Sequence, residues 1–156
     1  TIANAERGGY ELFKAWSGST KDQELQVTLD MVAVREMEHS WAFEKRLNEL
    51  GFALQPASTN KQLNKQVRFL KSSASDEDKF ASLGVGAEKA KGSTSEDSDG
   101  LLQILADKSI DPQTGALMGR FISEERDSGR QLIKAHKAML RKKMSKNKKG
   151  KLKKRG

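Results

Sequence analysis

The chain has 156 residues, no cysteine and a formal net charge of +8 at pH 7. This length allows one domain with a hydrophobic core, and without cysteine there is no disulfide, thiolate metal site or cysteine nucleophile. No apolar run approaches the roughly 20 residues of a membrane span, and no signal peptide is visible. We therefore expect a soluble protein of the cytoplasm or an organelle interior, and the first residue, Thr1, leaves room for N-terminal processing.

Helical periodicity predicts an all-α protein, and its first two helices form a hairpin over residues 1–50. Apolar residues three or four positions apart predict one helix over residues 2–17 and a longer one over residues 21–50. The few residues between them imply that the two helices run antiparallel.

Residues 51–93 are predicted to be a long crossover that contains short helical segments, one over 62–70 and one that begins near Ser75. A second hairpin is predicted over residues 94–141. Its first helix covers about 95–109, and its second begins at Pro112, because Asp-Pro supplies an N-cap and a first helical residue.

The positive charge is concentrated at the C-terminus. Of the 29 Lys and Arg residues, eleven lie from Lys137 onward, where there is no acid, which leaves 18 for residues 1–136 against 21 acids. We expect residues 142–156 to be a disordered basic tail that either binds nucleic acid or another polyanion or only aids solubility. Its basic residues are Lys142, Lys143, Lys146, Lys148, Lys149, Lys151, Lys153, Lys154 and Arg155.

Charged residues interrupt the apolar stripes of the predicted helices. Glu36 and His39 lie one turn apart in the second helix, Glu6 lies in the first, and Glu124 lies in the fourth, one turn before Asp127. Burying such groups costs several kcal/mol unless they are compensated, and clustered carboxylates need a cation or protons. Two interpretations stay open: a metal site, or a polar layer closed by hydrogen bonds such as one between His39 and Glu6.

The second hairpin is a weak repeat of the first. Residues 97–104 align with residues 6–13, with an acid, a glycine and an apolar residue at the same offsets. Asp97 then takes the place of the glutamate in the first helix, and Asp127 takes the place of the histidine. The alternative for these two aspartates is an ordinary acid at a helix start and one on a solvated face.

A helix with Glu-x-x-Gly-x-x-x-Phe, followed thirty residues after its glutamate by Glu-x-x-His, resembles the ferritin-like superfamily, nearest to the rubrerythrin-type di-metal carboxylate proteins. The resemblance implies an up-down-down-up four-helix bundle over residues 1–141, with one long crossover. It also implies two Fe or Mn ions, or a single ion if the second half-site is lost. The implied ligands are Glu6, Glu36, His39, Asp97, Glu124 and Asp127.

The same resemblance implies an oxidase, peroxidase-like or iron-handling activity on O₂ or peroxide, and a possible homodimer. The missing cysteine pairs exclude a complete rubrerythrin. The competing hypothesis is a non-catalytic helical scaffold with a lost or partial metal site, which docks on nucleic acid or another acidic partner through its tail. Glu38, Glu125 and Arg126 are expected at the surface or around the ligands.

Overall fold

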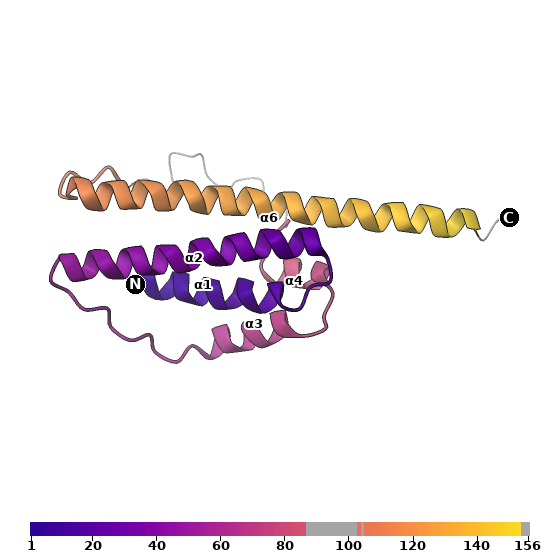
Figure 1. Ribbon diagram of the computed structural model, residues 1–156, viewed down its shortest axis with the longest axis horizontal. Helices are drawn as coiled ribbons and strands as arrows, with labels where there is room; N and C mark the ends of the chain where they lie inside the picture. The colour runs from indigo at the N-terminus through magenta and orange to yellow at the C-terminus, as the bar shows by residue number, and fades with distance from the viewer. Residues whose placement is uncertain (87–102, 104, 154–156) are drawn as a thin grey trace.

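The computed structural model describes residues 1–86, 103 and 105–153, with side chains up to Ser145 (Figure 1). These residues form helices, turns and irregular segments without a strand, which confirms the all-α class. None of the described helices has the length and apolarity to cross a membrane. The helices are α1 (Ile2–Ser17), α2 (Gln23–Glu49), α3 (Lys61–Lys71), α4 (Asp76–Ser82) and α6 (Pro112–Lys153).

Short polar residues begin the helices by accepting hydrogen bonds from otherwise unpaired backbone N–H groups. The Asp22 carboxylate accepts from the backbone N–H groups of Glu24 and Leu25 at the start of α2. Asn60 and Ser75 cap α3 and α4 in the same way. The predicted helical segments in the crossover are thereby confirmed as α3 and α4.

Helix α2 is the central element of the fold. It contacts α1 along one side and α6 along another, while α3 packs on α1 and α4 contacts α6 (Figure 1). The predicted antiparallel pairing of the first two helices is thus confirmed.

Apolar side chains on these helices form two clusters with a polar layer between them. One cluster lies towards the α1–α2 turn; it comprises Trp16, Leu25, Leu29, Val32, Leu70, Phe80 and Leu132. The other lies towards the opposite end; it comprises Ala3, Phe43, Met118, Phe121 and Ile122. Along α2 the order is apolar cluster, then Glu36 and His39, then Phe43, so the charged residues lie between two hydrophobic regions.

Two boundaries differ from the prediction. The helix predicted over residues 95–109 lies mostly outside the described residues, and residues 106–111 form turns, so it ends earlier than expected. Helix α6 continues to Lys153 rather than ending near Arg141, so residues 142–153, expected to be disordered, are helical in the structure. Lysine is a good helix former, and acids from α2 and α4 pair with the first two lysines of this segment.

Candidate metal centre

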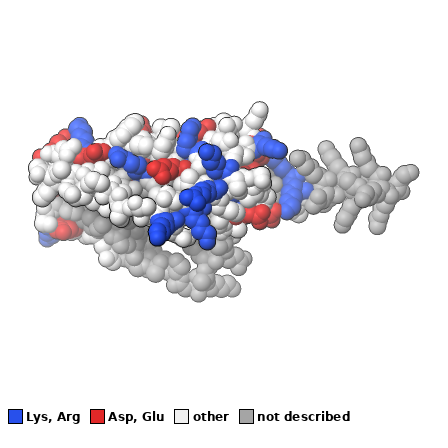
Figure 2. Space-filling model, turned by 90° about the horizontal axis from the view of Figure 1, so that it is seen from below, with Lys and Arg blue, Asp and Glu red and all other residues white. Residues whose placement is uncertain are grey.

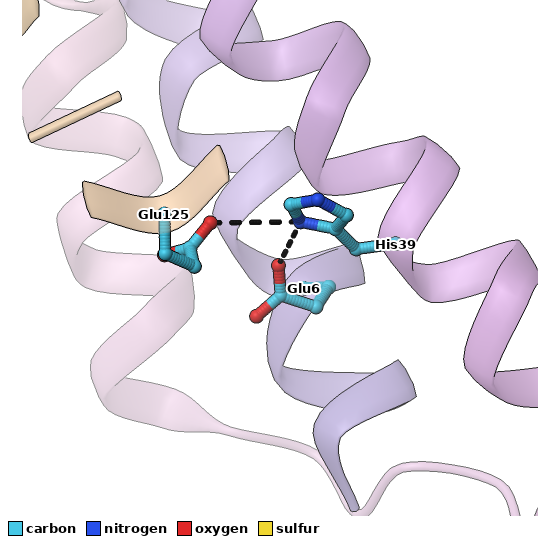
Figure 3. A group of neighbouring side chains, drawn as sticks. All are labelled: Glu6, His39 and Glu125. Atoms are coloured by element: carbon cyan, nitrogen blue, oxygen red, sulfur yellow. Dashed lines mark hydrogen bonds and ion pairs between the residues drawn. The ribbon is translucent and has the colours of Figure 1, made fainter. Parts of the chain in front are cut away.

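Three helices contribute side chains to one buried site. Glu6 comes from α1, His39 from α2, and Glu125 from α6, and the three side chains point towards one another (Figure 3). The His39 side chain is 3% exposed. Its Nδ1 lies 3.1 Å from Glu6 Oε2 and 3.5 Å from Glu125 Oε1, while its Nε2 lies 2.7 Å from Glu124 Oε2. We call these four residues, together with Glu36, the polar layer.

Glu36 reaches this layer because α1 has a glycine opposite it. A Cβ atom placed on Gly9 would lie 2.0 Å from Glu36 Oε2, which is closer than any real contact. The absence of a side chain at Gly9 therefore lets α1 approach α2 and gives the carboxylate its space.

The polar layer perturbs the pKa of its members. Burial by itself lowers the pKa of His39, but the Glu125, Glu6 and Glu124 carboxylates outweigh it and raise this pKa to about 10. Burial, with the nearby Glu6 and Glu125 carboxylates, raises the pKa of Glu36 to about 8. At neutral pH the layer therefore holds an imidazolium and a protonated Glu36.

Glu124 behaves differently because it lies at the edge of the layer. Burial acts to raise its pKa, but hydrogen bonds from His39 and Arg120 hold it below its usual value. Arg120 Nε lies 2.9 Å from Glu124 Oε1, so the carboxylate is fixed between the buried imidazole and a surface guanidinium.

The donor atoms of Glu6, His39 and Glu125 fit one metal ion. They all lie within 4.8 Å of one another, and ligands bonded to one ion at about 2.1 Å lie roughly 3 Å apart. Glu125 Oε1 is also the buried side-chain oxygen without a hydrogen-bond partner in the described part of the chain. It lies 3.5 Å from His39 Nδ1, and a cation would satisfy it more fully. Imidazole with two carboxylates suits Fe, Mn or Zn.

The predicted ligands do not all come together. Glu6, Glu36, His39 and Glu124 belong to the polar layer, whereas Asp97 lies outside the described residues. Asp127 Oδ2 lies 2.8 Å from Arg35 Nη1, and its Oδ1 lies 3.4 Å from Arg130 Nη2. The hydrogen bond from Arg35 opposes burial and lowers the pKa of Asp127. The structure thus places Asp127 in an ion-pair cluster of its own.

Glu125 was expected at the surface or around the ligands, and its side chain is 33% exposed and lies next to His39. Its Oε1 enters the polar layer beside His39. The sequence shows two adjacent glutamates, and a helix turns by about 100° per residue, so a rotation of α6 decides which of them faces inward. Here Glu124 and Glu125 both face α2, one on each nitrogen of the imidazole.

A small cavity lies against the outer side of the layer. Its volume is about 150 Å³, and its lining residues are Glu38, His39, Trp41, Ala42, Leu117, Arg120 and Phe121. Trp41 is 61% exposed, so the residues that line the cavity include both the buried His39 and a surface residue.

Comparisons with protein-family models, curated proteins and solved structures gave no significant match for the chain. The fold and the site therefore define the chain only as an all-helical protein with a buried carboxylate–histidine layer.

Proposed function

We propose that this chain is a metal-binding helical protein in which Glu6, His39 and Glu125 hold one Fe or Mn ion. The observation that carries the proposal is the convergence of three donor atoms from three helices, one of which is a buried oxygen without a hydrogen-bond partner. The antiparallel α1 and α2, which present Glu6 opposite Glu36-x-x-His39, support a ferritin-like relationship as part of this proposal.

One ion fits better than the pair that the sequence suggested. A second ion would need Asp127, whose two oxygens already lie near Arg35 and Arg130. Using this carboxylate as a ligand would break its ion pairs with Arg35 and Arg130. We therefore propose a mononuclear site with two ligands from the first hairpin, Glu6 and His39, and one from α6, Glu125.

A bound Fe or Mn ion would supply Lewis-acid or one-electron redox chemistry. The protein would contribute the groups and the space around the ion. Glu36 stores a proton beside the ligands, Arg120 fixes Glu124, and the cavity next to His39 admits a molecule as small as O₂ or peroxide. An oxidase or peroxidase-like reaction is the activity that these features favour.

Metal titration of two matched variants tests the site. Glu125→Gln and Asp127→Asn each remove one negative charge from the same helix, two residues apart. We expect wild type to bind one Mn(II) or Fe(II) per chain, Glu125→Gln to bind at least about tenfold more weakly, and Asp127→Asn to match wild type. Isothermal titration calorimetry under anaerobic conditions measures the affinities. Equal losses in both variants, or a loss only in Asp127→Asn, would contradict the assignment.

Gly9→Ala tests the position of Glu36 independently. The new methyl group must displace the Glu36 carboxylate, so we expect about tenfold weaker Mn(II) binding. Alanine favours the helix by about 1 kcal/mol over glycine, which offsets the cost of moving the carboxylate. Thermal stability should therefore change little. Gly8→Ala is the control, since its Cβ would meet only the Leu63 side chain, at 3.2 Å. If both variants bind Mn(II) like wild type, Glu36 has no role near the ion.

A purely structural polar layer is the second candidate function. Both ring nitrogens of His39 already lie within hydrogen-bond distance of carboxylates, so protons alone can close the layer. The titration separates the two candidates, because a structural layer predicts no stoichiometric binding of Mn(II) or Fe(II) by wild type.

A further inference from the structure

The C-terminal part of α6 projects beyond the other helices. The helix continues to Lys153, and in Figure 1 its last turns extend past the N-terminal end of α2. Residues 144–153, which we call the basic extension, span about 15 Å at a rise of 1.5 Å per residue.

The base of this extension is fixed by ion pairs. Lys142 Nζ lies 3.0 Å from Asp22 Oδ2 and 2.7 Å from Glu24 Oε2, both at the start of α2. Lys143 forms an ion pair with Glu77 at the start of α4. Basic and acidic side chains accordingly lie side by side where the helix leaves the body of the protein (Figure 2). These acids neutralise the first two lysines and hold α6 in its direction.

Beyond this point the charge has one sign. The basic extension has five lysines and no acid. At about 100° per residue, the register positions of these lysines spread over about 220° of the helix circumference, and three of them fall close together, at positions 146, 149 and 153. The five lysines are Lys146, Lys148, Lys149, Lys151 and Lys153.

We propose that the basic extension binds the phosphate backbone of double-stranded nucleic acid. Five like charges along one short helix repel one another. A polyanion offsets this repulsion, and its bound counterions are released when the lysines replace them. Duplex DNA carries about one negative charge per 1.7 Å of its axis. The five lysines, which span about 15 Å of helix, can therefore each contact a phosphate. Binding is independent of sequence.

The composition of the extension disfavours other partners. In its sequence Met144 and Leu152 are the only apolar residues, too few for the apolar stripe that a membrane-surface helix needs. Protein interfaces are depleted of lysine and enriched in aromatic residues, and the extension has no aromatic residue. For the same reason it offers no platform on which single-stranded bases could stack. This inference does not depend on the metal site.

The test compares two fivefold Lys→Gln variants of the full chain that lose the same charge. The extension variant changes Lys146, Lys148, Lys149, Lys151 and Lys153. The control variant changes exposed lysines elsewhere: Lys21, Lys45, Lys61, Lys65 and Lys71. Fluorescence anisotropy with two 20-base-pair duplexes of unrelated sequence measures binding, and circular dichroism checks that both variants remain helical.

We expect wild type and the control variant to bind both duplexes alike, and the extension variant to lose at least about 100-fold in affinity at 50 mM salt. For five phosphate contacts, wild-type affinity should fall about 500-fold between 50 and 200 mM salt. A fivefold Lys→Arg variant of the extension should bind like wild type.

Equal weakening in both Lys→Gln variants would overturn the proposal, because net charge rather than the extension would then determine binding. Tighter binding to vesicles with phosphatidylserine, or to poly-glutamate, than to the duplexes would overturn it as well. The metal titration is a separate measurement, so failure of one proposal leaves the other intact.

Discussion

Replacing His39 by alanine should lower the free energy of unfolding by about 3 to 5 kcal/mol at pH 7 in the absence of metal. The side chain is almost completely buried, and it pairs with Glu6 through Nδ1 and with Glu124 through Nε2. Its removal leaves carboxylates close together without the cation that separates them, and it removes the edge-on contact with the Phe121 ring. Chemical denaturation followed by circular dichroism measures the loss.

The pH dependence of this effect has a definite sign. Because the folded-state pKa of His39 is raised from 6.5 to about 10, its contribution to stability is fully present below about pH 6.5 and is lost as the pH rises towards 10. The difference between wild type and His39→Ala should therefore shrink over this range. His136→Ala is the control for the loss of an aromatic ring, since this ring packs on Phe80. A constant difference for His39→Ala from pH 6.5 to 10 would show that the folded protein contains neutral imidazole.

Replacing Glu36 by glutamine should stabilise the metal-free protein by about 1 to 3 kcal/mol at pH 7.5. The folded-state pKa of Glu36 is raised from 4.5 to about 8, so folding must keep a proton on a group that the unfolded chain leaves ionised. Stability is therefore lost as the pH rises from 4.5 to 8. Glutamine has the same shape, needs no proton, and can donate to Glu6 as the protonated carboxyl does.

Denaturation curves at several pH values between 4.5 and 8 measure this effect. Wild type should lose stability over this range more steeply than Glu36→Gln, and the two curves should converge near pH 4.5. A less stable Glu36→Gln at pH 7.5 would mean that the Glu36 carboxylate is ionised and compensated. Such a gain in stability from changing a polar group is typical of functional sites, where the native residue is kept for binding rather than for folding.

The sequence predicted the first hairpin well because its signals are local. Periodic apolar residues and short polar caps define α1, α2 and the start of α6 without reference to the rest of the chain. The end of α6 was misjudged for a physical reason. A run of lysines resembles disorder by composition, but acids at the starts of α2 and α4 hold its first residues in a helix. This contact joins positions more than 60 residues apart, so no local pattern shows it.

The site was predictable where one helix face determines it. Glu36 and His39 interrupt an apolar stripe, so their burial followed from spacing alone. Glu125 and Asp127 were not predictable, because their roles depend on the rotation of α6 against α2. That rotation brings Asp127 to Arg35 and turns Glu125 towards His39. The internal repeat predicted a ligand at Asp127, but it could not show that Arg35 lies opposite.

One of the two tryptophans is buried and the other is exposed, so tryptophan fluorescence can report on two different parts of the protein. Trp16 is 0% exposed and donates from Nε1 to Asp76 at 2.7 Å, whereas Trp41 is largely exposed beside the cavity that reaches His39. Fluorescence from Trp16 should therefore be blue-shifted and report on unfolding. Emission from Trp41 should be red-shifted and, being nearer the candidate ligands, should be the component that a paramagnetic ion quenches. A Trp41→Phe variant would isolate the core signal, and Trp16→Phe the signal of the site.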